Sequence, residues 1–318
     1  MKRIIAILLL LISGQVVFGQ SVVSGDKKPL RVLGYLLSDE NWQTDVQQVD
    51  LTRITDICLA FLNPDSTGAF HTKPSLRSFV QQLKQQKIRT FISLGGADAP
   101  PYIAELTQPG NRQQFIRHIV DFASTYGFDG VDVDYEGEYV NSNYSDFILA
   151  LGEALRAKQL LMTAALATYN SKFINDQAIQ SFDFINIMAY DKTGPWNMKK
   201  PGPHSSYEAA VQDFEYYHVQ RKVPAEKLYI GLPFYGYVFG ETAARSMKYN
   251  QIIAQFPGAE YADEWPTADG TVYYNGKSTI KRKVQFAQSA GAGGVMIWEL
   301  KQDSKNEHSL LQVIQQSK

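Results

Sequence analysis

The sequence lacks several features that define common protein classes. It has one cysteine, Cys58, in 318 residues, so no disulfide can form within one chain. Its 31 Lys and Arg residues are balanced by 32 Asp and Glu residues, whereas a nucleic-acid binder needs a basic excess to contact phosphates. Beyond residue 20 no apolar run reaches the roughly 20 residues of a membrane span. The 44% hydrophobic and 12% aromatic content nevertheless indicates a folded globular chain.

Motifs typical of metal and cofactor enzymes are also missing. The five histidines form no ligand-spaced pair that would indicate zinc. Neither a Gly-x-Ser-x-Gly elbow nor a phosphate-binding loop occurs. The glycine-rich run at residues 291–294 precedes an apolar segment, whereas a dinucleotide-binding fingerprint follows one. We therefore expect neither a metal ion nor an organic cofactor.

The first 19 residues have the pattern of a secretory signal peptide. Lys2 and Arg3 precede an unbroken apolar run at residues 4–12, and a plausible cleavage site at residues 17–19 precedes Gln20. The alternative, a membrane anchor, needs a longer apolar run. We expect residues 1–19 to be removed, residues 20–318 to form one catalytic domain with no membrane span, and the protein to be secreted or periplasmic.

The remaining chain alternates strand-like and helix-like segments. Several strand-like runs are almost continuously apolar, which is typical of strands buried on both faces of a parallel sheet. Strands are expected at residues 31–37, 54–62, 88–94, 130–135, 160–166, 182–190, 228–234 and 294–298, and helices at 74–86, 111–126, 143–158, 206–221 and 279–290. Eight such units predict an α/β fold, a single (β/α)8 TIM barrel. The alternative is an open doubly wound sheet, which lacks support because its glycine fingerprint is missing.

The fourth expected strand carries a row of acidic residues. Side chains alternate between the two faces of a strand, so Asp132, Asp134 and Glu136 share one face, while Val131, Val133 and Tyr135 share the other. Three carboxylates pointing into a barrel repel one another and lose hydration, which favours a retained proton near neutral pH. A protonated carboxyl is what a general acid needs, and Glu136 lies furthest toward the C-terminal end of the strand.

Two other interpretations of the acidic row are open. The first is a calcium-binding EF-hand loop, which fails because its twelfth position is Asn143 where a Glu is required. The second is a solvated strand edge, which would not need apolar residues at every alternate position. The sequence favours the row as a catalytic feature.

This row resembles the defining motif of glycoside hydrolase family 18, the chitinases and their relatives. Residues 129–136 read DGVDVDYE, which matches the family's DG-x-D-x-D-x-E. Four more segments match the family in the right order: residues 93–96 (SLGG), 188–191 (MAYD), 231–236 (GLPFYG) and 294–298 (GVMIW). The resemblance covers essentially the whole chain after residue 20, and it implies the same barrel.

The resemblance also implies roles for the motif residues. Glu136 would be the general acid, and the substrate's own N-acetyl oxygen would attack the anomeric carbon, so that no enzyme carboxylate acts as nucleophile. Asp134 would orient the acetamido N–H, and Asp132 would lie deeper and share a proton with it. Ser93 would donate to this buried pair, and Tyr190 would hold the acetamido oxygen.

The remaining candidates would bind substrate. The resemblance implies that Asp191 contacts sugar hydroxyls and that Trp298 forms an apolar floor under the sugar at the cleaved bond. Met188 belongs to the same MAYD segment as Tyr190. Tyr35 on the first strand and Phe61 on the second are weaker candidates for the pocket wall. The implied partner is an oligosaccharide or polysaccharide that contains N-acetylglucosamine.

Further aromatic residues point to the same end of the barrel. All four tryptophans, which are Trp42, Trp196, Trp265 and Trp298, are expected at strand ends or in the loops that follow, where flat rings stack on sugars.

The segment between the last two strands departs from many family members. Residues 237–292 leave room for only a small elaboration, which favours a shallow, open cleft and soluble or accessible chains. Tyr237 stands where many chitinases have arginine. The activity expected is that of a chitinase. The alternatives are an endo-β-N-acetylglucosaminidase acting on N-glycan cores, a cell-wall hydrolase and a non-catalytic lectin, and the last usually lacks the acid that Glu136 provides.

Overall fold

The computed structural model describes residues 29–39, 41–240 and 244–318. The signal peptide expected at residues 1–19 lies outside the described residues. None of the helices within these ranges is both long enough and apolar enough to cross a membrane.

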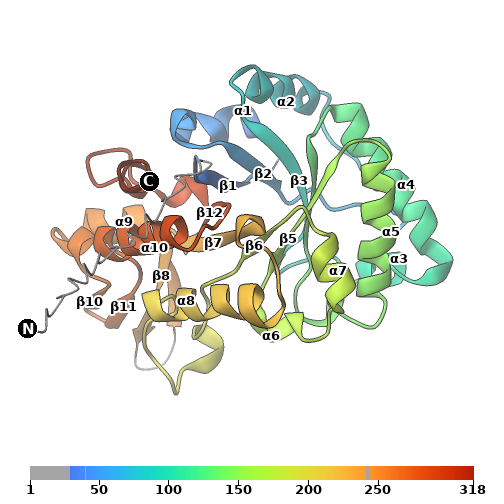
Figure 1. Cartoon of the computed structure of the whole chain (residues 1–318). Coiled ribbons are helices and arrows are strands. Elements are labelled where there is room, and N and C mark those ends of the chain that lie inside the picture. The colour runs from blue at the N-terminus through green and yellow to red at the C-terminus, as the bar shows by residue number, and fades with distance from the viewer. Residues whose placement is uncertain (1–28, 40, 241–243) are drawn as a thin grey trace, which may run out of the picture.

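Eight parallel strands close into a barrel in the order β1-β12-β7-β6-β5-β4-β3-β2 (Figure 1). The strands are β1 Arg31–Leu37, β2 Asp56–Ala60, β3 Arg89–Gly95, β4 Gly130–Asp134, β5 Leu161–Leu166, β6 Phe184–Ile187, β7 Leu228–Pro233 and β12 Gly294–Trp298. The predicted (β/α)8 barrel is confirmed, and each strand lies within or close to its expected segment. Strands β2 and β6 are shorter than expected at both ends, because their buried apolar segments extend into the flanking loops.

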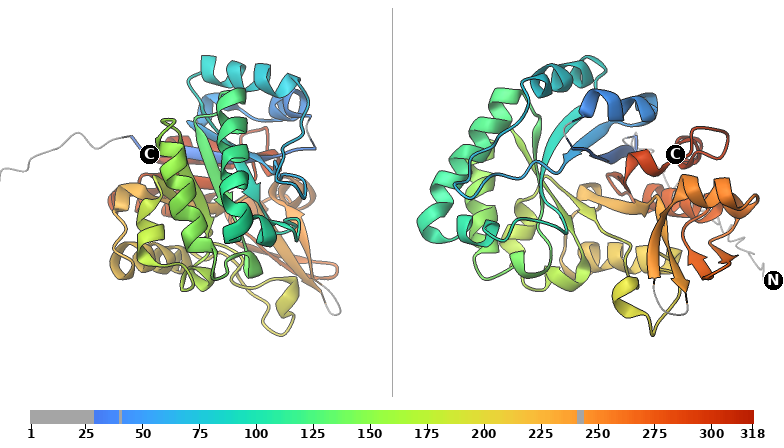
Figure 2. Two further views of the ribbon diagram at one scale, coloured as in Figure 1. Left: turned by 90° about the vertical axis from the view of Figure 1, so that its right-hand side faces the viewer. Right: turned by 180° about the vertical axis from the view of Figure 1, so that it is seen from behind.

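Helices cover the outside of the barrel (Figure 2). The helices are α1 Trp42–Asp45, α2 Ser75–Gln85, α3 Ile103–Leu106, α4 Pro109–Tyr126, α5 Tyr144–Arg156, α6 Thr168–Ser171, α7 Asp176–Ser181, α8 Tyr207–Glu215, α9 Tyr249–Gln255, α10 Lys277–Ser289 and α11 Leu310–Ser317. Helix α4 shows why the sequence predicts its ends: Pro109 opens it, and Gly127 closes it in the left-handed conformation at φ 79°. The five expected helices are present, and the other helices are short ones that the sequence analysis did not predict, including α11 after the last strand.

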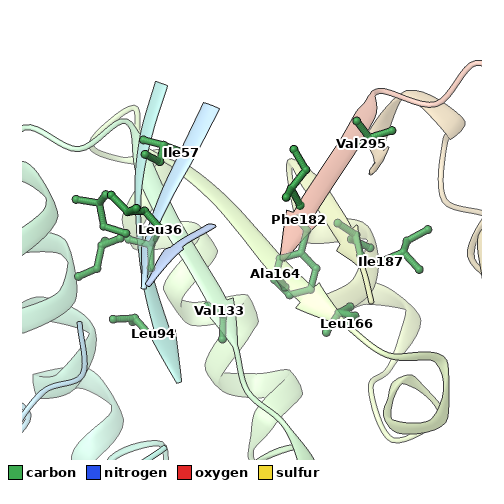
Figure 3. Packing of buried hydrophobic residues seen from close by; sticks show 14 of the residues in the cluster. Leu36, Ile57, Leu94, Val133, Ala164, Leu166, Phe182, Ile187 and Val295 are labelled. Atoms are coloured by element: carbon green, nitrogen blue, oxygen red, sulfur yellow. The ribbon is translucent and has the colours of Figure 1, made fainter. Parts of the chain in front are cut away.

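The main core lies between the strands and the helices. Outward-facing strand residues such as Val131 and Val133 are fully buried there, and Tyr135 stacks on Phe147 of α5 with the ring centroids 5.9 Å apart. Figure 3 shows members of this core: Leu36, Ile57, Leu94, Val133, Ala164, Leu166, Phe182, Ile187 and Val295. The alternation on β4 therefore places its valines outward and its aspartates inside the barrel, as expected.

A second sheet interrupts the seventh βα unit, between β7 and α10. Strands β8 Tyr235–Gly240, β9 Ala244–Lys248, β10 Glu264–Thr267 and β11 Gly270–Tyr273 form an antiparallel sheet in the order β10-β11-β8-β9. It lies beside α9 and α10 at one side of the barrel (Figures 1 and 2). The elaboration expected between the last two barrel strands is thus a four-stranded sheet with one short helix, and the shallow, open cleft stays a prediction. Short strands of mixed polarity carry little periodic signal.

Candidate active site

The carboxylates of β4 enter the site at increasing height in the barrel. Asp132 is fully buried and Asp134 is 4% exposed, whereas Glu136 follows the end of the strand and is partly exposed. The parallel register pairs Asp132 with Ser93 and Asp134 with Gly95 of β3. The alternating row therefore runs from the barrel interior to its C-terminal end, where the substrates of such barrels react.

Asp132 is the centre of a buried hydrogen-bond network. Its carboxylate accepts hydrogen bonds from the Tyr35 hydroxyl at 2.7 Å, the Ser93 hydroxyl at 2.8 Å, the Thr163 hydroxyl at 2.7 Å and the Asn186 amide at 3.2 Å. These donors come from four different strands. Burial nevertheless raises the pKa of Asp132, and the hydrogen bonds oppose that shift. These four hydrogen-bond donors can satisfy the Asp132 carboxylate without a proton shared with Asp134.

Asp134 has a different environment one layer higher. Its Oδ1 atom is buried and has no hydrogen-bond partner among the described residues. Burial raises its pKa well above the usual range, and the negative charges of Glu136 and Asp132 add to the shift. Burial of a carboxyl oxygen without a donor favours the neutral acid, so the surroundings of Asp134 favour its protonated form.

The surroundings of Glu136 raise the pKa of its carboxyl group. Burial is the main cause that raises its pKa to about 7, and the charges of Asp191 and Asp98 contribute further. A carboxyl group with a pKa near the working pH can both give and take a proton, which is what a general acid and base requires.

The loop after β6 carries Tyr190 and Asp191. Tyr190 is 8% exposed, and its hydroxyl lies 3.8 Å from Met296 Sδ on β12. Asp191 adopts a left-handed backbone conformation with φ 58°, which is uncommon for a residue other than glycine. Its carboxylate accepts a hydrogen bond from the Tyr235 hydroxyl at 2.5 Å and lies 3.2 Å from Nδ1 of His204.

Aromatic side chains surround the same end of the barrel. Trp298, at the end of β12, lies 5.5 Å from Tyr35 and stacks on Phe61 with the centroids 5.7 Å apart. Met188 packs against the same inner cluster. The structure therefore brings Tyr35, Phe61, Met188 and Trp298 together with the carboxylates.

The tryptophan expectation needs correction. Trp42 is 1% exposed and belongs to the outer core, so its ring cannot stack on a sugar. Trp265 lies in the second sheet, half-buried against Phe256. Trp196 does offer a free face, since it is 64% exposed and 5.7 Å from Tyr237. A loop position after a strand does not fix which way a large apolar ring points, and burial in the core is the stronger force.

Five residues of the site were not predicted as site residues. Thr163, Asn186, His204, Tyr235 and Tyr237 all lie in the networks and ring contacts just described. Thr163 and Asn186 had a visible signal, because each is the polar residue of an otherwise apolar strand. His204 had none, because it lies in a loop that contacts Asp191 only in the folded chain. Tyr237 was noted only as a departure from the family.

The described residues contain no group of three or more His, Cys, Asp or Glu side chains arranged to hold a metal ion. The chemistry of the site is that of carboxyl, hydroxyl and aromatic groups.

A closed (β/α)8 barrel with an acidic row that ends in a carboxyl group of raised pKa has the kind of site that acid–base hydrolysis of a glycoside uses. The family model described as glycosyl hydrolases family 18 matches residues 31–303. The chain belongs to this family.

Individual relatives are chitinases. The crystal structure of the GH18 chitinase ChiB from the chitin utilization locus of Flavobacterium johnsoniae is 38% identical, with a TM-score of 0.81 over 91% of this chain and 94% of that one. The class V chitinase of Arabidopsis thaliana is 25% identical over 82% of this chain and 83% of its own length. The probable chitinase 10 of Drosophila melanogaster is 28% identical over 61% of this chain, which spans only 10% of that protein.

Proposed function

We propose that this protein hydrolyses β-1,4-linked N-acetylglucosamine in chitin or chito-oligosaccharides, with retention of configuration and with Glu136 as the general acid. The observation that carries the proposal is the contrast along β4. Asp132 is saturated by donors, Asp134 is buried without them, and Glu136 has a pKa of about 7. The chitinases similar to this chain support the choice of substrate.

The first step cleaves the glycosidic bond. Glu136 gives its proton to the glycosidic oxygen as the bond to the anomeric carbon breaks. The carbonyl oxygen of the substrate's own N-acetyl group forms the new bond to that carbon, which gives an oxazolinium ion. A carboxyl oxygen of Asp134 accepts a hydrogen bond from the acetamido N–H, on which positive charge develops, and Tyr190 holds the acetamido oxygen in line.

The second step reverses these roles. The Glu136 carboxylate takes a proton from water, and the water oxygen attacks the anomeric carbon on the face that the leaving group occupied. The oxazolinium ring opens, the N-acetyl group is restored, and the configuration is retained. Trp298 forms the apolar floor beneath this sugar, and Asp191 contacts its hydroxyls.

Other functions on the same barrel are less well supported. A lectin does not require a protonated Glu136 at the end of the acidic row, and burying charge there is costly without a catalytic use. An endo-β-N-acetylglucosaminidase acting on N-glycan cores, or a hydrolase acting on peptidoglycan, would use the same acid. Product analysis on chitohexaose beside a high-mannose glycoprotein separates these substrates.

The Glu136→Gln variant tests the general acid. We expect chitohexaose hydrolysis to fall by at least about a thousand-fold, because the amide cannot give up a proton, while chitohexaose still binds. Glu138→Gln is the matched control, because Glu138 is an exposed acid two residues further on. Turnover by Glu136→Gln at the wild-type rate would remove the central assignment.

Substrate assistance predicts that the N-acetyl group is essential. Fully deacetylated chitohexaose should not be cleaved, since it lacks the carbonyl oxygen that replaces an enzyme nucleophile. Product release from the acetylated and deacetylated oligomers, measured side by side, checks this. Equal rates would instead require a nucleophilic carboxylate of the protein.

A further inference from the structure

A lysine is fully buried behind the loop that carries Tyr190 and Asp191. Lys283 lies on α10 with 0% exposure, in the buried stripe formed by Thr279, Ile280, Val284 and Ala287. An apolar residue would be expected at this position of an amphipathic helix. Burying an ammonium group costs several kcal/mol, so its presence requires an explanation.

Hydrogen bonds, not carboxylates, hold the Lys283 side chain. Its Nζ atom lies 2.8 Å from the Ser205 carbonyl oxygen, 2.7 Å from Ser205 Oγ and 2.7 Å from Asn275 Oδ1. No ion pair in the described ranges involves Lys283. Two nearby carboxylates have other partners: Asp213 pairs with Lys192 at 2.7 Å, and Asp263 accepts from the Gly276 amide and the Thr279 hydroxyl.

The three contacts require three N–H groups on the lysine. The carbonyl oxygen of Ser205 and Oδ1 of Asn275 can only accept. The Ser205 hydroxyl uses its own hydrogen toward the Ala189 carbonyl oxygen at 2.6 Å, so it too accepts from Lys283. Only the ammonium form supplies all three donors. Burial lowers the pKa of Lys283 to about 7, opposed by the charges of Asp263, Asp213 and Glu208 and assisted by that of Lys192.

His204 and Ser205 hold the loop after β6 from both sides. The Ser205 hydroxyl binds Ala189, the residue before Tyr190, and the Lys192 amide donates to the His204 carbonyl at 2.9 Å. The His204 ring lies 3.2 Å from the Asp191 carboxylate and 3.3 Å from the Tyr235 carbonyl oxygen. Tyr190 and Asp191 are therefore fixed by a segment that Lys283 and Asn275 hold in turn.

We propose that Lys283 is a positioning residue for catalysis, which acts through Ser205 to fix the loop that presents Tyr190 and Asp191 to the substrate. The inference rests on the proposed function, because Tyr190 and Asp191 matter only if they contact the reacting sugar. The strands of the barrel wall alone do not fix the position of this loop. The buried ammonium group of Lys283 on α10 and the Asn275 amide after the second sheet fix it through Ser205.

Lys283→Met tests the role, with Lys281→Met as the matched control, because Lys281 is exposed on the same helix. We expect kcat on chitohexaose to fall at least about ten-fold in the folded Lys283→Met protein, since misplaced groups weaken the transition state most. Chitohexaose affinity, measured in the Glu136→Gln background, should change by less than about three-fold. Hydrogen exchange of amides 188–192 in the free protein should become faster, and Lys281→Met should leave every readout unchanged.

A second variant covers the case in which Lys283→Met does not fold. Ser205→Ala removes the hydroxyl that donates to the Ala189 carbonyl oxygen and accepts from Lys283, and it should lower kcat and speed the same exchange. In the double variant, Ser205→Ala should lower kcat by less than it does alone, because both substitutions break the same chain of contacts to the loop. Wild-type kcat in either folded variant, or a lower kcat with unchanged exchange at 188–192, would overturn the inference. If the wild type does not cleave chitohexaose, the proposed function fails instead, while the exchange measurement still shows whether Lys283 fixes the loop.

Discussion

At the scale of single residues, three carboxyl groups on one strand acquire different chemistry from their surroundings. Asp132 receives four donors, Asp134 has one oxygen with none, and Glu136 remains partly exposed with a pKa of about 7. Residue type is not enough to separate them, since two are identical. Position along the barrel axis decides how much water and how many donors each group meets.

The charge environment of Glu136 predicts the pH dependence. The proposed general acid must be protonated to act, so kcat/KM should fall as pH rises through about 7. Asp98 is an exposed acid whose charge raises this pKa, so Asp98→Asn should move the alkaline limb to lower pH by a few tenths of a unit. The pH profile of kcat/KM on chitohexaose measures this shift. Asp121→Asn, which changes an exposed acid on α4, is the control. A limb that stays in place or moves to higher pH would contradict the assignment.

At the scale of elements, the close approach of β3 and β4 sets the position of the acidic row. Gly95 ends β3 at φ 107°, and a Cβ atom placed there would lie 2.2 Å from the Asp134 carbonyl oxygen. The neighbouring Gly96 leaves no room either, because a Cβ would meet the Phe61 ring at 2.4 Å. These glycines allow backbone packing at the point where the acidic strand is paired.

Gly95→Ala should therefore damage both stability and activity. The methyl group forces β3 away from β4 and strains a positive φ, which we expect to cost about 2–4 kcal/mol of unfolding free energy. The displaced Asp134 should lower kcat by at least about ten-fold. Denaturant unfolding and chitohexaose kinetics check both effects. Gly110→Ala on α4 is the control, since its Cβ would meet nothing within 4 Å and should leave activity unchanged; equal behaviour of the two variants would refute the packing argument.

At the scale of the whole molecule, the second sheet is part of the site's support. Strand β8 supplies Tyr235 and Tyr237 to the Asp191 environment, and Asn275 at the end of the insertion contacts Lys283. The barrel therefore provides the carboxylate row, while the insertion and α10 provide part of the frame that holds the opposing loop.

The N-terminal segment predicts that the protein is exported and cleaved. If residues 1–19 are a signal peptide, protein recovered outside the cytoplasm should have a mass that starts at Gln20. Intact-mass measurement of the fractions checks this. Leu9→Arg interrupts the apolar run and should leave full-length protein inside the cell, whereas a full-length exported wild type would contradict cleavage at this site.

The sequence by itself determined the barrel and most of the candidate site residues. Alternating strand-like and helix-like segments predicted eight βα units, and the period of two along residues 130–136 placed Asp132, Asp134 and Glu136 on one face. The matching segments at other strand ends then brought in Ser93, Tyr190 and Trp298. Such patterns are local, so they can be read without knowing which strands are neighbours.

Only the tertiary structure decided how these residues are supported. Thr163 and Asn186 reach Asp132 because β4, β5 and β6 are adjacent, and His204 reaches Asp191 from 13 positions away. The Trp42 ring is buried in the outer core, and Lys283 lies in a stripe of otherwise mostly apolar side chains. Burial, donor saturation and the resulting pKa values depend on groups that approach from distant segments, and that information exists only once the chain is folded.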